Sequence, residues 1–274
     1  MRIYISADIE GVAGVVARES LRPGGHDYDR ACDWMTDTVL TACETLRELG
    51  ASEVVVSDSH GNGQNIRFER MPAYVSLVRS WPRPLGMMQG IEVGAYDGAL
   101  LIGYHAGATN PAGTLSHTIS GEFFHEVRFN GTVLSEAGIS AALGGHFGVP
   151  VLMIAGDDVA VAETRDLLGD IAGATLKTSY GFLSALSPSL EVAHERLRAG
   201  VRDAVGRIGA AKPYVIAGPV DLQIRLRTRF VAEWLSYLPH IERRDAFTIG
   251  YHARDVLAAT RFLEFLTSAR TAIG

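Results

Sequence analysis

The chain has 274 residues, of which 47% are hydrophobic and 20% are charged, and its formal net charge is −6. This length allows one domain or two, and the ordinary composition excludes a disordered or collagen-like chain. The acidic balance argues against a nucleic-acid groove or an anionic membrane surface as partner. No apolar run reaches the roughly 18 residues that a membrane span needs.

The amino terminus and the cysteines bear on the cellular compartment. Met1-Arg2 leads directly into a strand pattern, without the apolar region and small-residue cleavage site of a signal peptide. We therefore expect a cytoplasmic protein. Cys32 and Cys43 fall within one helical pattern, so we expect buried free thiols and no disulfide.

The first strand carries two acids to its carboxyl end. Ile3-Tyr-Ile5 is a short β-prone run that ends in Asp8-Ile-Glu10, with Gly11 at the turn. Residues two apart on an extended chain point the same way, roughly 7 Å apart. Two such carboxylates repel each other unless a cation lies between them, although a helix cap or an arginine partner would also explain them.

A strand–helix–strand unit follows. Apolar residues recur at helical spacing from about 27 to 49, and Gly50 ends this helix. Residues 53–57 form a second buried strand that ends in Asp58-Ser59-His60. The pattern predicts a right-handed crossover between parallel strands. Weaker patterns predict a short helix at 66–70 and a strand at 73–78.

The middle of the chain adds strands and a hairpin. Residues 98–103 predict a third buried strand, which ends in Tyr104-His105. Two further strands, 123–129 and 132–134, flank the tight-turn pair Asn130-Gly131. This hairpin delivers Glu136 to the start of a helix at 138–147. A fourth strand at 149–155 ends in Asp157-Asp158, which we interpret as a cap for the helix at 160–168. A strand at 175–179 is predicted less clearly.

The last part of the chain has a different pattern. It predicts helices at 187–208, 230–238 and 255–270, and strands at 220–227 and 246–250. We therefore expect an α/β fold with a mostly parallel sheet flanked by helices over residues 1–186. Residues 187–274 would form a smaller α+β lobe packed on it.

Metal-ligating side chains follow three of the predicted strands. Asp8 and Glu10, Asp58 and His60, and His105 would meet at the carboxyl edge of one parallel sheet, and Glu136 is a plausible further ligand. Histidines with carboxylates and no cysteine favour a catalytic metal site, zinc first, with manganese, cobalt or iron also possible. Asp58 could be a ligand, a helix cap or a partner that fixes the other ring nitrogen of His60, and we expect the last of these.

His117 is a candidate general base or acid. It lies in the loop Thr114-Leu-Ser-His-Thr-Ile, shortly after His105. An ordinary surface histidine is an equally good interpretation of this pattern. The segment Gly61-Asn-Gly63 is not followed by the lysine and Ser or Thr that end a phosphate loop, so we do not interpret it as one.

These motifs together resemble the zinc-dependent D-aminopeptidase family, metallopeptidase family M55. The resemblance rests on Tyr4-Ile-Ser-Ala-Asp-Ile-Glu-Gly11, Asp58-Ser-His60, Gly103-Tyr-His-Ala106, Leu115-Ser-His117 and Glu136-Ala-Gly138, with weaker matches at 151–158 and 232–234. It implies two zinc ions per subunit, held by Asp8, Glu10, His60, His105 and Glu136, with His117 as the catalytic residue. It also implies a homodecamer of two stacked pentamer rings, with the active sites facing an inner chamber.

The implied activity is removal of an amino-terminal D-residue, typically D-alanine, from short peptides and amides. Metal-activated water would attack, assisted by His117. The loop 61–65 and the arginine-rich strand 223–229 are the departures that bear on specificity. The alternatives are another metallohydrolase such as a phosphoesterase, a non-catalytic peptide- or metal-binding protein, and a structural interpretation in which these residues are only caps and ion pairs.

Overall fold

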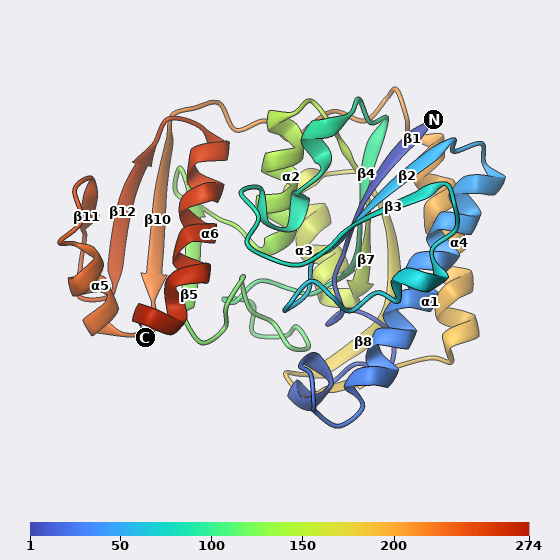
Figure 1. Ribbon diagram of the computed structural model, residues 1–274, viewed down its shortest axis with the longest axis horizontal. Helices are drawn as coiled ribbons and strands as arrows, with labels where there is room; N and C mark the ends of the chain where they lie inside the picture. Colours follow the sequence, from blue (N-terminus) through green and yellow to red (C-terminus); the bar gives the residue numbers. More distant parts are fainter. Residues whose placement is uncertain (274) are drawn as a thin grey trace.

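Residues 1–273 are described by a computed structural model, in which two β-sheets are separated by helices (Figure 1). The larger sheet has seven strands in the order β3-β2-β1-β4-β7-β8-β9, and only β9 pairs antiparallel. Its strands are β1 (Arg2–Ala7), β2 (Glu53–Asp58), β3 (Val75–Val78), β4 (Gly98–Tyr104), β7 (Val151–Asp157), β8 (Ala172–Gly181) and β9 (Ser184–Leu186). The predicted α/β class with a mostly parallel sheet is confirmed.

Helices cover both faces of this sheet, which is why its central strands are apolar throughout. Ile3 and Ile5 of β1 pack into the core on the side of α1 (Tyr28–Glu48) and α4 (Leu190–Gly206). Tyr4 points the opposite way, into the core that contains residues of α2 (Glu136–His146) and α3 (Asp158–Leu168). The alternation of the strand thus divides β1 between two apolar cores.

The second sheet is antiparallel, in the order β11-β12-β10-β5-β6. Its strands are β5 (Phe124–Phe129), β6 (Thr132–Val133), β10 (Val220–Leu226), β11 (Ile241–Arg243) and β12 (Thr248–Ala253). Two helices accompany it, α5 (Arg229–Leu235) and α6 (Val256–Ile273). Figure 1 shows α6 between this sheet and α2, and α6 contacts both.

The two sheets do not divide at residue 187, where the sequence pattern changes. The hairpin β5–β6 pairs with β10 in the second sheet, although it precedes that residue. Helix α4 follows it, yet packs on α1 and β8 of the first sheet. The hairpin turn itself has the predicted geometry, since Asn130 and Gly131 both have positive φ, 49° and 82°.

Short elements and local features complete the fold. Single 3₁₀ turns lie at Arg18–Leu21, Phe68–Arg70, Gly86–Met88 and Ile91–Val93. Cys32 and Cys43 are buried free thiols, as predicted. In the described part of the chain, none of the helices combines the length and apolar character that a membrane crossing requires.

The strand order of the first sheet reverses at β1. The chain moves from β1 outward to β2 and β3, then returns to the other side of β1 as β4. In open parallel sheets, such a switch point leaves a crevice at the carboxyl ends of the strands. The segments that carry Asp8, His60 and His105 all leave the sheet there, from β1, β2 and β4.

Two glycines let these strand ends approach closely. A Cβ on Gly103 would lie 2.0 Å from the carbonyl oxygen of Asp8, and Gly103 has a φ of +75°. The N–H of Gly11 donates to the carbonyl of Gly103 across 2.7 Å. The backbone after β1 therefore lies directly against the end of β4.

Candidate metal and catalytic site

Asp8 and Glu10 enter the site from the turn after β1, and both carboxylates are buried, at 3% and 2% exposure. The fully buried ammonium of Lys177 lies beneath this turn and donates to the carbonyls of Glu10, Val12 and Val15. Burial lowers the pKa of Lys177 to about 8, against the opposing effect of nearby acids. The lysine thus joins the turn to β8.

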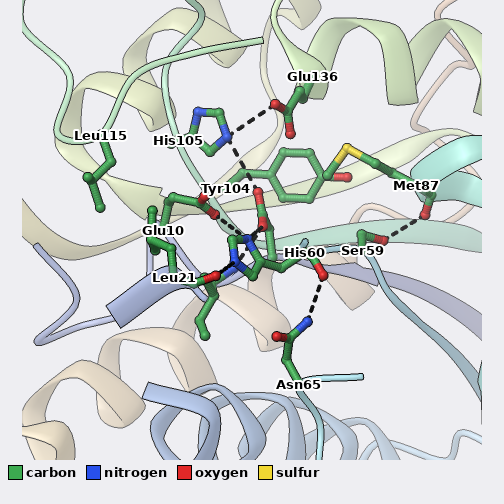
Figure 2. A network of polar contacts seen from close by, with 12 residues as sticks. Glu10, Leu21, Ser59, His60, Asn65, Met87, Tyr104, His105, Leu115 and Glu136 are labelled. Atoms are coloured by element: carbon green, nitrogen blue, oxygen red, sulfur yellow. Dashed lines mark hydrogen bonds and ion pairs between the residues drawn. The ribbon is translucent and has the colours of Figure 1, made fainter. Parts of the chain in front are cut away.

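His60 follows β2 and faces both acids of the first turn. Its Nδ1 lies 3.2 Å from Oδ1 of Asp8 and 2.9 Å from Oε2 of Glu10. Its Nε2 lies 2.7 Å from the carbonyl oxygen of Leu21, at the end of the 3₁₀ turn before α1. Figure 2 shows this ring between Glu10 and Leu21, with Asn65 bonded to the His60 carbonyl.

His105 and Glu136 close the other side of the cluster. His105 Nε2 lies 3.5 Å from Oδ2 of Asp8 and 3.3 Å from Oε1 of Glu136, while its Nδ1 lies 2.9 Å from the carbonyl of Ala106. Glu136 is the first residue of α2. Its Oε1 accepts the N–H of Ile119 across 2.5 Å, which fixes the carboxylate toward His105 (Figure 2).

His117 lies on the loop that follows β4, and its ring stacks on His105 with centroids 4.0 Å apart. Its Nε2 lies 3.6 Å from Oε1 of Glu136 and 3.9 Å from Oε1 of Glu10. Its Nδ1 lies 2.9 Å from the carbonyl of Leu115. At 23% side-chain exposure, His117 is more accessible than the other members of the cluster.

The three imidazoles share one arrangement. In each ring, the outward nitrogen faces a backbone carbonyl, which accepts only, so that nitrogen carries the proton. The inward nitrogen of a neutral ring then presents a lone pair to carboxylate oxygens, which are acceptors too. This contact is repulsive unless a proton or a metal cation lies between them.

Burial and charge also indicate that the cluster requires a cation. Glu10 Oε2 and His105 Nε2 are buried and make no hydrogen bond to any described residue. Burial opposes the charged form of His105, but the carboxylates of Glu136, Glu10 and Asp8 outweigh it and raise its pKa to about 10. Burial and the neighbouring Glu10 raise the pKa of Asp8. The cluster is therefore short of positive charge.

The donor atoms form three overlapping groups in which all atoms lie within 4.8 Å of one another. The first is Asp8, Glu10 and His60, the second is Asp8, His105 and Glu136, and the third is Glu10, His105 and His117. Asp8 is common to the first two groups. Nitrogen and oxygen donors without sulfur fit a catalytic zinc pair. All six predicted site residues thus lie together.

The prediction that Asp58 fixes the ring of His60 was wrong. Its carboxylate accepts the N–H groups of Asn65 and Ile66 and the side-chain amide of Asn65, so it braces the loop after His60. The outer nitrogen of His60 instead faces the carbonyl of Leu21. Asp157 is the helix cap that was predicted, and its other oxygen accepts the N–H of Thr114 at the start of the His117 loop.

A cavity of about 330 Å³ opens from the cluster. Glu10, His60, His117 and Glu136 line one part, and the 3₁₀ turn Gly86–Met88 lines another. Helix α6 adds Thr260, Leu263, Glu264, Thr267 and Ser268. Sequence reasoning missed the contributions of α6 and of Trp81, because only long-range packing brings them to this edge of the sheet.

The family model described as D-aminopeptidase, peptidase family M55, matches residues 1–265. A D-aminopeptidase of Bacillus subtilis (strain 168) is 29% identical over 270 residues, covering 97% of each chain. Among solved structures, the Zn-dependent D-aminopeptidase DppA from Bacillus subtilis, called a self-compartmentalizing protease, superposes with a TM-score of 0.93, covering 100% of both chains at 27% identity.

Proposed function

Because the chain belongs to the D-aminopeptidases of peptidase family M55, which are metallo-aminopeptidases, we propose that it is a binuclear zinc aminopeptidase. It removes the amino-terminal residue, a D-amino acid such as D-alanine, from short peptides and amides. The observation that carries this proposal is the set of three imidazoles, each fixed from outside by a carbonyl and aimed at buried carboxylates.

In this proposal, five side chains would hold the metals: Asp8, Glu10, His60, His105 and Glu136, of which Asp8 belongs to two of the donor groups. Bound zinc supplies a Lewis acid for the scissile carbonyl and lowers the pKa of a water molecule toward neutrality. The zinc dependence of the structural relative supports this choice of metal, while other divalent ions with the same ligand preference stay as alternatives.

His117 moves a proton. Burial and the neighbouring His105 lower its pKa, against the opposing carboxylates of Glu136 and Glu10, so its ring is neutral near pH 7. Its Nδ1 donates to Leu115, which leaves a lone pair on Nε2. Because His117 lines the cavity, Nε2 can accept a proton at the reacting centre and return it to the leaving amine.

A phosphoesterase is the main alternative within the metallohydrolases. Phosphate recognition relies on arginine or lysine donors. Among the described residues that line the cavity, none is an arginine or a lysine. A peptide amide presents no such requirement, so the lining favours the aminopeptidase.

Assembly and location are part of the same proposal. The relative described as self-compartmentalizing supports a homodecamer of two pentamer rings around an inner chamber. Exposed apolar side chains, a common mark of subunit contact, occur on and after α5 (Phe230, Trp234, Tyr237) and at the β8–β9 turn (Tyr180, Phe182, Leu183). We propose the cytoplasm as its location, which fractionation of cells would test.

The deciding experiment is a hydrolysis assay after metal removal and reconstitution. We expect zinc to restore activity on D-alanyl amide and D-alanyl dipeptides, with much lower kcat/KM for the L-enantiomers and none for phosphate esters. Metal analysis should give two zinc ions per chain. Bound zinc without hydrolysis of any aminoacyl amide would favour a non-catalytic binding protein, and the absence of bound metal would leave only structural roles.

A further inference from the structure

Glu264 is a carboxylate in the cavity that the proposed reaction does not use. It lies on α6, is partly buried and lines the cavity. In the described part of the chain it makes no hydrogen bond or ion pair, and it belongs to none of the groups that could hold a metal. A carboxylate that loses water without a protein partner carries a desolvation cost, which a cationic ligand can offset.

Arg83 acts on the charge of Glu264 but makes its hydrogen bonds to other residues. Burial raises the pKa of Glu264 to about 7; Arg83 opposes this rise and Glu136 adds to it. Arg83 is not among the residues that line the cavity, and its guanidinium donates to Ser57 and to the carbonyl of Asp58. The ring of Trp81 lies against that guanidinium, 3.8 Å from centroid to Cζ, and itself lines the cavity.

The turn opposite Glu264 is shaped to admit its carboxylate. A Cβ on Gly86 would lie 2.4 Å from Oε1 of Glu264, and Gly86 has a φ of +53°. Any larger residue at this position would therefore displace the carboxylate from its place over the turn. The Glu264 carboxylate thus sits directly on the 3₁₀ turn Gly86–Met88.

Apolar side chains line much of the cavity that also contains Glu264 and the metal-binding cluster: Leu85, Met87, Met88, Ile139, Leu143 and Leu263. Such a lining suits methylene groups, and a carboxylate suits an ammonium group. A lysine side chain has this combination, because it buries its aliphatic stem and keeps its charge solvated or paired. A cavity of about 330 Å³ is also larger than the methyl side chain of alanine requires.

We propose that Glu264 determines specificity for an amino-terminal residue with a long aliphatic side chain that ends in an amine, such as D-lysine. The inference rests on the proposed aminopeptidase function and deepens it. With the scissile carbonyl at the metal cluster, the side chain of the first residue extends along the apolar lining. Its ammonium group then pairs with the carboxylate of Glu264.

The test compares D-lysyl, D-norleucyl and D-alanyl amides on the zinc-loaded enzyme. Norleucine keeps the four-carbon chain and lacks the amine. We expect the wild type to prefer the lysyl over the norleucyl substrate. In Glu264→Gln, kcat/KM for the lysyl substrate should fall about 10- to 100-fold, as expected for loss of a charged hydrogen bond, with the other two substrates changed less than about twofold.

Two controls accompany this variant. Glu195→Gln removes the same charge from an exposed position on α4 and should leave all three substrates unchanged. Glu264→Asp keeps the charge and should retain part of the lysyl preference. Zinc content and thermal stability are measured for each variant, so that misfolding is recognised.

Three results overturn the proposal. One is a wild type without preference for lysyl over norleucyl, and another is an unchanged lysyl preference in Glu264→Gln. The third is an equal loss on all three substrates, which would mean that Glu264 binds the α-ammonium common to them. Hydrolysis of the D-alanyl amide in the same assay separates these outcomes from a failure of the aminopeptidase function itself, in which no amide is cleaved.

Discussion

His117 differs from the other members of the cluster in its position at the cavity. It is the most exposed of them and lies farthest from the carboxylates, at 3.6 and 3.9 Å. Donor atoms of His117, Glu10 and His105 also lie within 4.8 Å of one another, so His117 is placed where it could equally bind a metal. Removing the imidazole distinguishes proton transfer from metal binding.

For His117→Ala, we expect kcat/KM on D-alanyl amide to fall about 10²- to 10⁴-fold, the usual contribution of a general acid or base, with zinc content unchanged. Activity and metal per chain are measured on the same dialysed sample. His146→Ala, at an exposed position of α2, is the control. Near-normal turnover would remove His117 from the mechanism, and loss of zinc would make it a ligand.

The clustering of the site residues could be predicted from local sequence, but the hydrogen-bond partners that orient them could not. Asp8, Glu10, His60 and His105 each follow an apolar strand pattern, and the geometry of parallel sheets brings such positions together. The partner of His60 was assigned to Asp58, its neighbour in sequence. The actual partner is the carbonyl of Leu21, and a backbone oxygen leaves no residue-type signal.

The contact between the ends of β1 and β4 sets how closely the ligands meet. Gly103 is the last residue of β4 before Tyr104, and its place against Asp8 leaves no room for a side chain. The same close contact sets the spacing between the turn that carries Asp8 and the segment that carries His105. An added methyl group would therefore act on the fold and on the site together.

For Gly103→Ala, we expect a loss of about 2–4 kcal/mol in the free energy of unfolding, from positive φ and steric overlap together. Zinc affinity should fall as well. Urea unfolding of the metal-free protein and a zinc titration measure the two effects. Gly148→Ala is the matched control, because Gly148 has a φ of +74° with no atom near its Cβ position; it should cost only about 1–2 kcal/mol. Equal losses in both variants would refute the steric argument.

Element types were more predictable than element partners. The Asn130-Gly131 turn has the positive φ values that its sequence demands, but its hairpin pairs with β10, about 90 residues further along the chain (Leu222 opposite Phe129). That pairing is decided by long-range packing. The two-residue and three-residue strands β6, β9 and β11 are too short for a periodicity to develop.

At the scale of the whole molecule, the cavity depends on the docking of α6 between the second sheet and α2 (Figure 1). Its sequence shows an apolar helix, but not which cavity its polar residues line. Glu264 and Thr260 therefore escaped sequence analysis, although they face the same space as Glu136. Local patterns predict whether a segment is a helix or a strand, whereas the complete fold determines which elements it packs against.

The proposed assembly makes a prediction at the same scale. Size-exclusion chromatography with light scattering should give ten times the mass of one chain. Negative-stain images should show a ring-shaped outline. The physical reason is the exposed aromatic surface on α5 and at the β8–β9 turn, which subunit contact would cover. A single-chain mass at assay concentration, with full activity, would refute the decamer.

The backbone carbonyls that hold His60, His105 and His117 belong to Leu21, Ala106 and Leu115. A carbonyl oxygen is present whatever side chain its residue carries, so the orientation of each ring is insulated from point changes at these three positions. It depends instead on the path of the loops. Evolutionary drift in residue identity there is tolerable, while insertion or deletion of a single residue would turn an imidazole away from the carboxylates.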